Sequence, residues 1–313
     1  MTITQLQYVL AVAENKNFTL AAEKCFVTQP TLSMQIQKIE EELNVLIFDR
    51  SKKPIQLTEI GKKIVNQAKN IVNEAGRIKD IVEQEKGFIG GEFRLGIIPT
   101  IMPTLLPMFL KNFIKKHPKV KLIIEELNTD EIILKLKNGH LDAAIAATPL
   151  MEEKLKEIVL YYEPFMAYLP DNHQFSEKTE IEISDINLDE ILLLQDGHCF
   201  RDGILNLCKN QEIISNNSFQ LESGSFETLI RLADEGLGTT LLPFLHTLEL
   251  NEESRKKLHH FKEPKPAREV SLIFPKTELK IHIIDALRQT ISGVIKGAIL
   301  FQNVEIISPL AKK

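Results

Sequence analysis

Apolar positions recur at helical spacing through the first 58 residues, in three short runs that polar breaks separate. The first run spans residues 4–14 and ends at Asn15 to Asn17, after which Thr19 can cap a second helix. Thr28 can cap a third helix, in which Pro30 is tolerated because first-turn amides lack intrahelical partners. The apolar face of this third helix consists of Leu32, Ile36, Ile39 and Leu43. Short helices joined by tight turns predict a helix-turn-helix.

The polar face of the third helix suits contact with base edges and phosphates in a major groove, since Lys38 is its one charged residue. Residues 46–50 and 54–58 then predict two strands joined by a basic turn, which together make a wing. The alternative is an ordinary small helical bundle with a solvated face. The residues assigned to DNA contact are Thr28, Gln29, Pro30, Thr31, Ser33, Met34, Gln35, Lys38, Arg50, Lys52 and Lys53.

Residues 59–90 predict a dimerisation helix that ends in a glycine-containing hinge. Apolar residues recur here with alternating gaps of four and three, the repeat of a coiled coil. Such a seam needs a partner, and a second copy of the chain would place two reading helices on a palindromic operator. The alternative is packing of the helix onto its own domain. The seam consists of Ile64, Ala68, Ile71, Ala75, Ile78 and Val82.

Strand-like and helical runs alternate beyond residue 90, which predicts an α/β fold with helices on both faces of a parallel sheet. We expect two α/β subdomains within residues 91–313. One comprises about 91–163 plus 272–300, and the other 164–271. Ligands of such sheets bind beyond the carboxyl ends of strands, which places Thr100 and Thr129 at the mouth of a site. Each threonine alone is better explained as a helix cap.

The composition excludes several classes of protein. No apolar run approaches the ~20 residues that span a bilayer, and the amino terminus lacks a basic signal-peptide region, so we expect a cytoplasmic protein with no membrane contact. Its net charge of -5 means that nucleic-acid contacts must come from local basic clusters. Three cysteines make no disulfide framework, and Cys25 falls where core packing is expected. The sequence contains no paired cysteine and histidine spacing of the kind that binds a metal ion, and we expect no cofactor.

The segment from Asp196 to Cys208 is where we expect the chemistry. Cys199 is flanked by His198 and Arg201, and it follows an apolar run at 191–194 that reads as a buried strand. Neighbouring positive charge and a helix amino terminus both lower a thiol pKa, so this sequence favours a reactive thiolate. Two cysteines nine residues apart on a helix would lie ~13 Å apart along its axis, so a bond to Cys208 would require refolding. The alternative is two unrelated reduced thiols.

The amino-terminal module resembles the DNA-binding domain of LysR-type transcriptional regulators. It departs from that pattern at Asn44, where glycine is usual, and at Ile47, where leucine is usual. Residues 139–145 and 236–243 are similar to the effector domain of the same family, whose fold resembles periplasmic binding proteins. The resemblance implies a homodimer or homotetramer that binds double-stranded operator DNA, with RNA polymerase as a partner. It rests on Phe18, Ala21, Ala22, residues 28–33, Ile36, Ile39, Glu40, Leu43, Phe48, Arg50, Leu57 and Thr58.

Residues 194–208 resemble the redox centre of the peroxide-sensing OxyR subfamily of that family. The resemblance implies that Cys199 reacts with hydrogen peroxide, that Cys208 resolves the product as a disulfide, and that a glutaredoxin- or thioredoxin-type reductant reverses it. It also implies that the peroxide site is formed by Thr100, Thr129, His198, Arg201, Asp202 and Arg268, the last in a loop at residues 262–269.

Two other functions are compatible with the sequence. One is a regulator of the same fold that binds a small metabolite and carries its cysteines incidentally. The other is a thiol peroxidase with Cys199 as nucleophile. No reductant site is recognisable in the sequence and an enzyme would leave the helix-turn-helix unexplained, so we expect a regulator rather than an enzyme.

Overall fold

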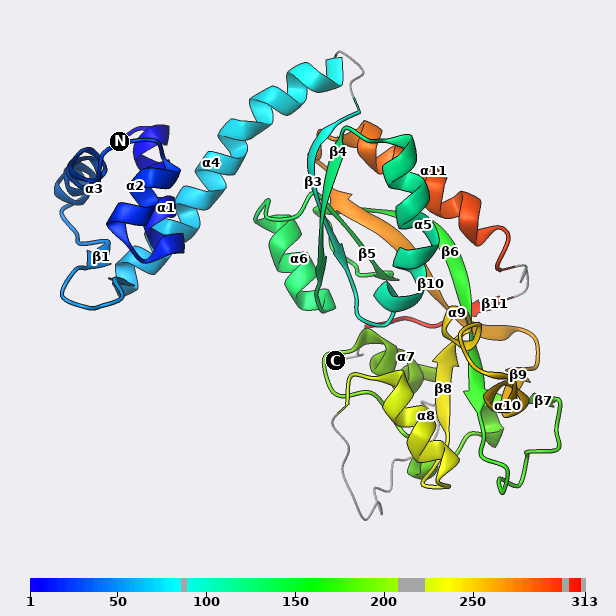
Figure 1. Ribbon diagram of the computed structural model, residues 1–313. Helices are drawn as coiled ribbons and strands as arrows, with labels where there is room; N and C mark the ends of the chain where they lie inside the picture. The colour runs from blue at the N-terminus through cyan, green and yellow to red at the C-terminus, as the bar shows by residue number, and fades with distance from the viewer. Residues whose placement is uncertain (86–88, 208–222, 300–303, 311–313) are drawn as a thin grey trace. The chain divides into compact units, whose positions relative to one another are not determined.

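A computed structural model describes residues 1–85, 89–207, 223–299 and 304–310 (Figure 1). The chain divides into two compact units. The first comprises residues 1–86 with 138–140, and the second comprises residues 87–137 and 141–313. Each unit has its own hydrophobic core.

The first unit contains the predicted helix-turn-helix, wing and long helix. Leu32, Ile36 and Ile39 are buried in its core together with residues of the first two helices. The two strands of the wing pair antiparallel, with Phe48 opposite Leu57. In chain order the elements are α1 (Ile3–Asn15), α2 (Phe18–Lys24), α3 (Gln29–Leu43), β1 (Phe48–Asp49), β2 (Gln56–Leu57) and α4 (Glu59–Glu85).

Details of this module differ from the sequence prediction. The second helix is capped by Asn17, whose Oδ1 accepts from the Thr19 amide at 2.8 Å, so the capping role expected of Thr19 is wrong. Thr28 occupies the cap position of α3, but its hydroxyl bonds to the Thr31 hydroxyl at 2.8 Å and caps no amide. Leu43 is 40% exposed and lies outside the core, because the chain turns away at Asn44 in a left-handed conformation.

The apolar seam of α4 has two parts. In the first half of the helix, Val65 and Ala68 are buried in the core of the helix-turn-helix, and Ile64 and Ile71 pack against it. Packing of the helix onto its own domain therefore holds for this half. Near the other end, Ile78 and Val82 are 67% and 48% exposed. Among the residues whose side chains are described, Ile78 and Val82 are thus the exposed positions of the predicted seam.

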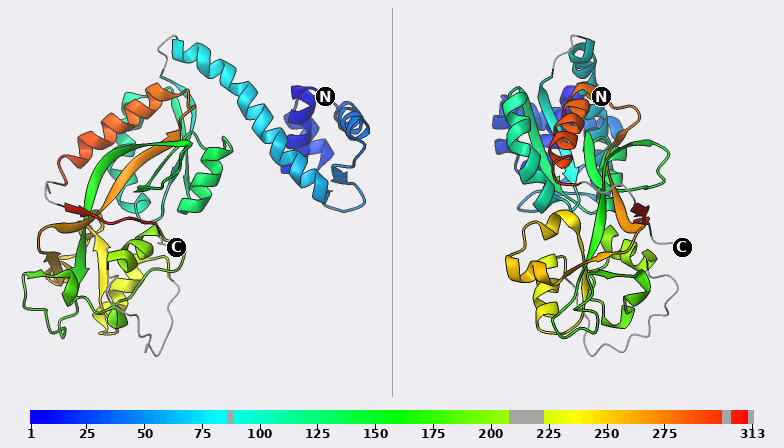
Figure 2. Two further views of the ribbon diagram at one scale, coloured as in Figure 1. Left: turned by 180° about the vertical axis from the view of Figure 1, so that it is seen from behind. Right: turned by 90° about the vertical axis from the view of Figure 1, so that its right-hand side faces the viewer.

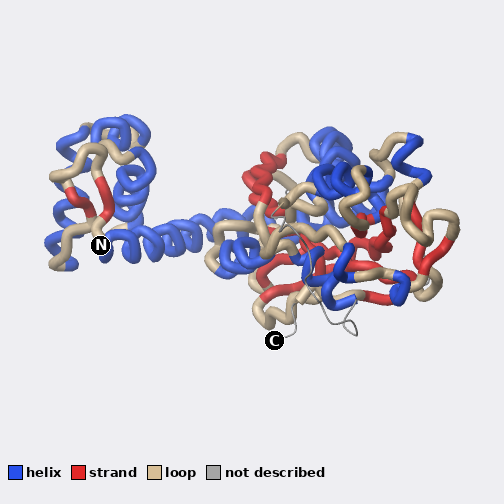
Figure 3. Tube along the Cα trace, turned by 90° about the horizontal axis from the view of Figure 1, so that it is seen from below, coloured by secondary structure: helices blue, strands red, loops and turns tan. Residues whose placement is uncertain are grey.

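Strands and helices alternate along much of the second unit, as the sequence predicted. Figure 3 shows both types of element in this unit. Its first half contains β3 (Gly91–Ile97), α5 (Met102–Lys116), β4 (Val120–Glu126), α6 (Thr129–Lys137), β5 (Ala143–Thr148), β6 (Leu155–Tyr168), β7 (Glu180–Ile181) and the 3₁₀ turns Ile183–Asp185 and Leu188–Glu190. Its second half contains α7 (Cys199–Leu207), α8 (Phe226–Asp234), β8 (Thr240–Pro243), α9 (Phe244–Thr247), α10 (Glu252–Lys256), β9 (Leu258–Phe261), β10 (Lys265–Pro275), α11 (Ile281–Ile295) and β11 (Val304–Ile306).

The α/β class is confirmed, but the sheet is mixed. β3 runs parallel to β4 and β5, whereas β10 runs antiparallel to both β5 and β6. The expectation of a parallel sheet is therefore wrong for the long strands that complete it. Helices α5 and α11 lie side by side on one face and α6 covers the other (Figures 1 and 2).

Two cores lie within the second unit, and β6 contributes to both. In β6, Leu155 and Tyr161 belong to the first core, whereas Phe165 and Tyr168 belong to the second. The polypeptide thus crosses between two subdomains along β6. Within the described ranges, no helix has the length and apolarity needed to cross a bilayer.

The expected strand at residues 191–194 does not form. Its side chains are buried, but its backbone makes only a single bridge, between Ile191 and Thr239. This approach requires Gly238, because a Cβ there would lie 2.4 Å from the Glu190 carbonyl oxygen. The segment is therefore a buried extended connection that leads into α7.

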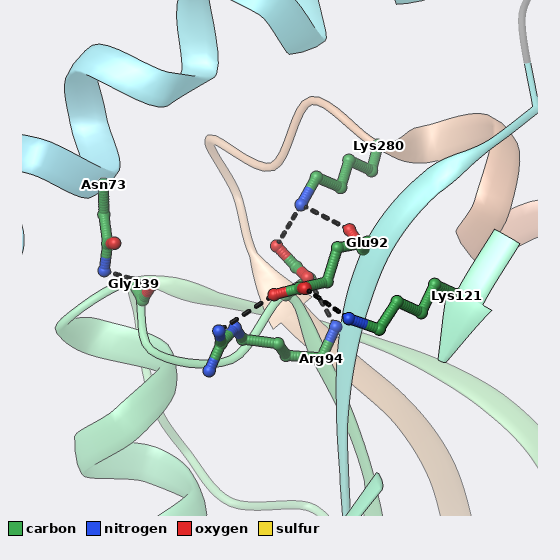
Figure 4. A network of polar contacts seen from close by, with 7 residues as sticks. Asn73, Glu92, Arg94, Lys121, Gly139 and Lys280 are labelled. Carbon is green, nitrogen blue, oxygen red and sulfur yellow. Dashed lines mark hydrogen bonds and ion pairs between the residues drawn. The ribbon is translucent and has the colours of Figure 1, made fainter. Parts of the chain in front are cut away.

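A polar network at one end of the first subdomain ties its strands together (Figure 4). The Lys280 Nζ lies 2.9 Å from Asp142 Oδ1 and donates to the Glu92 carbonyl at 3.0 Å. The Glu92 carboxylate pairs with Arg94 at 2.8 Å and with Lys121 at 3.4 Å. Such partly exposed ion pairs contribute little stability each, roughly 0–1 kcal/mol. This network joins β3, β4 and the start of α11, and it includes none of the residues predicted to react.

Candidate redox site

Cys199 is the first residue of α7, at the boundary between the two subdomain cores. The His198 carbonyl accepts from the Arg201 amide at 2.9 Å, which makes His198 the residue that opens the helix. Cys199 is 8% exposed and belongs to the first core, whereas its neighbour Phe200 belongs to the second. The sulfur therefore lies where the two subdomains meet, at a helix amino terminus.

Arg268 is the positively charged residue that lowers the pKa of this thiol. It lies within β10, so the expectation of a loop at residues 262–269 is wrong. Its side chain is 3% exposed. The Nη1 atom donates to Thr100 Oγ1 at 2.9 Å, and Nη2 donates to the Thr100 carbonyl at 3.0 Å. The guanidinium carbon also lies 5.3 Å from the centre of the Phe200 ring.

Thr100 is buried, and its hydroxyl is oriented by Arg268. Because Oγ1 accepts a hydrogen bond from Nη1, the hydroxyl hydrogen stays available to donate elsewhere. The residue precedes α5, which begins at Met102, and its hydroxyl does not cap that helix. Sequence alone explained Thr100 best as a helix cap. In the structure its hydroxyl is instead oriented by Arg268 and can donate a hydrogen bond.

Thr129 is the first residue of α6 and presents a buried hydroxyl. Its Oγ1 makes no hydrogen bond of normal geometry within the described residues, although it lies close enough to the Cys199 thiol to lower the pKa of that thiol. The cap of α6 is Asn128, whose Oδ1 accepts from the Glu131 amide at 2.9 Å. A buried hydroxyl without a partner is costly for the fold, so it marks a place where a polar ligand would be stabilised.

The electrostatics of Cys199 differ from the expectation based on sequence. Burial raises the pKa of the thiol above its ordinary value, and this effect outweighs the lowering by Arg268 and by the Thr129 hydroxyl. Asp202 adds a smaller raising effect. In the reduced fold, therefore, the thiol is not more acidic than a free cysteine, and the stabilising cation is Arg268.

Arg201 and His198 do not supply the positive charge that their sequence positions suggested. The Arg201 Nε pairs with Asp196 at 2.8 Å, and Nη1 donates to the Leu194 carbonyl at 3.2 Å. Burial lowers the pKa of His198, which favours the neutral imidazole. The pKa of Asp202 is raised by burial, while Arg201 partly offsets this.

One residue of the site was missed from the sequence. Glu163 in β6 is 0% exposed and lies directly opposite Arg268 in the pairing of β6 with β10. Its Oε2 accepts from Arg268 Nε at 2.8 Å. A single carboxylate within the apolar run from Leu160 to Leu169 was the available signal.

Cys208, the predicted resolving cysteine, lies outside the described residues. Cys25 is half-buried at the end of α2, against the core of the first unit. Within the ranges that the structure describes, no three His, Cys, Asp or Glu side chains come together as metal ligands would.

The predicted DNA-contacting face is exposed at the start of α3, where Thr28, Gln29, Pro30 and Thr31 are all accessible. Lys52 and Lys53 are exposed in the turn of the wing. Arg50 is engaged within its own domain, because its Nη2 lies 2.8 Å from the Glu40 carboxylate.

Residues 3–62 match the family described as bacterial regulatory helix-turn-helix protein, lysR family, and residues 86–295 match the LysR substrate binding domain. A hydrogen peroxide-inducible genes activator from Pectobacterium carotovorum is 31% identical over 300 residues, which cover 95% of this chain and 99% of the relative.

Solved structures of full-length regulators are similar to this one. Full-length OxyR from Pseudomonas aeruginosa, with an aspartate in place of a cysteine, matches with a TM-score of 0.73 and 33% identity, over 93% of this chain and 98% of that one. A hydrogen peroxide-bound cysteine-to-serine mutant of OxyR from Corynebacterium glutamicum matches with a TM-score of 0.63 and 28% identity, over 97% of this chain and 98% of that one.

Proposed function

Because the chain belongs to the LysR family of bacterial helix-turn-helix regulators, we propose that it is a DNA-binding transcriptional regulator whose effector is hydrogen peroxide. The observation that carries this proposal is the arrangement around Cys199. Arg268 is held beside the thiol, Thr100 has a hydroxyl hydrogen to donate, and Thr129 has a buried hydroxyl close to the thiol that makes no hydrogen bond of normal geometry within the described residues. A ligand with two adjacent hydrogen-bonding oxygen atoms suits both hydroxyls, and the names of the relatives support the same effector.

The first chemical step is attack of the Cys199 thiolate on one peroxide oxygen. An S–O bond forms and the O–O bond breaks, and the departing hydroxide takes a proton to become water. Thr100 and Arg268 are placed to donate hydrogen bonds to the oxygen on which charge develops. Positioned donors of this kind contribute on the order of 100-fold each to a rate. Cys199 becomes a sulfenic acid.

The second step is condensation of that sulfenic acid with the Cys208 thiol. The S–O bond breaks, a disulfide forms and water is released. Disulfide formation requires Cα atoms within roughly 7 Å, so α7 must unwind between its first residue and position 208. Unwinding of α7 would remodel the junction of the two subdomains, because Cys199 and Phe200 belong to different cores. This change of shape is the signal that we propose reaches the DNA-binding domain.

The DNA interface in this proposal is the exposed start of α3 together with the wing. Gln29 and its polar neighbours would contact base edges, whereas Lys52 and Lys53 would contact phosphates. Arg50 would also contact a phosphate, through N–H groups other than the one that pairs with Glu40, because its side chain is 39% exposed. We further propose a homodimer or homotetramer through α4, with operator DNA, RNA polymerase and a thiol reductant as partners in the cytoplasm.

The proposal is tested by footprinting on operator DNA with stepwise addition of peroxide. Cys199→Ser should keep DNA binding and lose the peroxide-induced change in footprint, whereas Cys25→Ser should behave as wild type. Peptide mass spectrometry at low peroxide doses should show a linkage between Cys199 and Cys208. A normal peroxide response in Cys199→Ser would overturn the proposal and favour a metabolite effector.

A further inference from the structure

Glu163 is a buried carboxylate to which the proposed chemistry assigns no step. Its side chain is 1% exposed, and it lies opposite Arg268 in β6, between Tyr161 of the first subdomain core and Phe165 of the second. A charge in this position is costly unless each of its oxygen atoms has partners.

Among the described residues, the groups that bond to the Glu163 carboxylate are N–H donors. Oε2 accepts from Arg268 Nε at 2.8 Å and lies 2.7 Å from Arg268 Nη2. Oε1 accepts from the backbone amide of Leu245 at 2.8 Å. The carboxylate therefore joins the arginine of the redox site to the start of α9, and an amide in its place could not satisfy both sides.

These contacts fix the direction of the guanidinium. Of its five N–H groups, the contacts with Glu163 and Thr100 use four. Among the described residues this leaves one N–H on Nη1, the same atom that donates to Thr100 Oγ1. An arginine clamped along its Nε edge presents its far Nη1 corner at a defined place, whereas an unclamped arginine can rotate on its long side chain.

We propose that Glu163 is a positioning residue for the peroxide reaction, which holds Arg268 so that its free Nη1 N–H and the Thr100 hydroxyl face the oxygen that leaves. The inference rests on the proposed function, because it concerns the same site. Glu163 acts through Arg268 and touches neither the thiol nor the peroxide. The alternative is that Glu163 only ties β6 to α9 through Leu245 and stabilises the fold.

A comparison of two thiol reactions in one set of variants separates these roles. All variants are made in a Cys208→Ser background, so that oxidation stops at the Cys199 sulfenic acid. The rate of oxidation by hydrogen peroxide reports thiolate formation together with stabilisation of the leaving oxygen. The rate of alkylation by iodoacetamide at the same pH reports thiolate formation and access alone. The ratio of the two rates isolates the contribution of positioned donors.

Glu163→Gln should lower the ratio of oxidation to alkylation about 100-fold, as expected when a reacting donor is misplaced by an ångström. Glu163→Asp keeps the charge but shortens the reach, so it should lower the ratio by less. It also keeps the test informative where the glutamine variant does not fold. Glu269→Gln is the matched control, because Glu269 is the next residue of β10 and bonds to Thr148, away from Arg268. Its ratio should equal that of wild type.

A double-mutant cycle with Arg268→Met then shows whether Glu163 acts through the arginine. The double variant Glu163→Gln with Arg268→Met should be no slower in oxidation than Arg268→Met alone. Losses that multiply in the double variant would overturn the inference, as would a wild-type ratio in both Glu163 variants. If peroxide fails to oxidise Cys199 in the background protein itself, the proposed function fails instead, and the two failures are thus distinguishable.

Discussion

Asn206, near the end of α7, donates a hydrogen bond of 2.9 Å from its Nδ2 to the main-chain oxygen of Ser308. The same amide donates to the Leu310 carbonyl at 2.7 Å. This carboxyl-terminal segment is itself anchored, because the Ile307 amide donates to the Ala267 carbonyl at 2.8 Å, next to Arg268. The helix that begins at Cys199 is thus tied, through the end of the chain, to the strand that carries Arg268.

Removing this tie should make the disulfide easier to form. Asn206→Ala loses two hydrogen bonds of about 0.5–1.5 kcal/mol each, so the reduced fold should lose roughly 1–3 kcal/mol. The oxidised form has an unwound α7 in our proposal and should lose little. The reduction potential of the Cys199–Cys208 pair should therefore become more negative by about 20–60 mV, which titration against a glutathione redox buffer measures.

The matched control for this variant is Asn251→Ala. Asn251 also makes a side-chain hydrogen bond to backbone, since its Oδ1 accepts from the Ser254 amide at 2.8 Å, but this bond caps α10. Its reduction potential should equal that of wild type. An unchanged potential in Asn206→Ala would show that α7 keeps its contacts with the carboxyl-terminal segment after oxidation.

Thr129→Val should separate reactivity from stability. Valine has nearly the same shape as threonine, and the Thr129 hydroxyl is buried without a normal hydrogen bond, so its removal should not lower the free energy of unfolding. The peroxide reaction should nevertheless slow about tenfold or more, because one donor to the bound peroxide is lost. Urea denaturation and the rate of sulfenic acid formation measure the two effects. A destabilised variant that reacts at the wild-type rate would assign Thr129 to the fold alone.

The raised pKa of Cys199 predicts a specific dependence of stability on pH. Burial raises this pKa in the folded protein, with a partial offset from Arg268, so the fold favours the protonated thiol. The resulting contribution to stability is full below the pKa of a free thiol, roughly 8.5, and is lost as pH rises through the folded value. Urea denaturation should therefore show wild type losing stability relative to Cys199→Ser only above about pH 8.5. A difference that grows between pH 5 and 7 would indicate a lowered pKa instead.

Helical periodicity predicted most of the fold, because each helix is specified by residues close together in the sequence. The runs that end at Asn15 and Leu43 and the long run from Glu59 became helices with nearly the expected bounds. The direction of the long strands was not predictable in this way. A buried apolar strand such as Leu272 to Phe274 has the same pattern whether its neighbours run parallel or antiparallel. The mixed sheet follows from a pairing between β5 and β10 over more than a hundred residues.

The run from Ile191 to Leu194 shows why burial alone is a weak signal for a strand. Four apolar residues in succession suit a central strand, but they equally suit a connection that two helices and a turn cover. Here Leu192 donates to the Thr239 carbonyl at 2.7 Å, and the Thr240 hydroxyl donates to the Leu192 carbonyl at 2.9 Å. These contacts satisfy both backbone groups of Leu192 without a strand partner along the segment.

The sequence predicted those residues of the candidate site that lie where a strand ends. It did not predict the residues that form an ion pair between distant parts of the chain. Thr100, Thr129 and Cys199 each follow a strand or extended run and lie just before or at the first residue of a helix, so their positions could be inferred. The ion pair between Glu163 and Arg268 joins residues 105 positions apart, and neither has a local motif. The wrong loop assignment for Arg268 has the same origin. The single carboxylate of Glu163 within an apolar run was the one trace of the pair in the sequence.

The carboxylate of Glu40 makes a comparable buried contact in the first unit, and it predicts how the wing is held on α3. Glu40 Oε1 accepts from the Ile47 amide at 2.7 Å and the Phe48 amide at 3.1 Å, and Oε2 accepts from Arg50 at 2.8 Å. An amide cannot satisfy donors on both oxygens, so Glu40→Gln should cost about 2 kcal/mol, read as a lower melting temperature of the DNA-binding domain. It should also weaken operator binding, because the wing loosens. Glu41→Gln is exposed and should change neither quantity. Equal melting temperatures for the two variants would show that α3 and the wing are held by apolar packing alone.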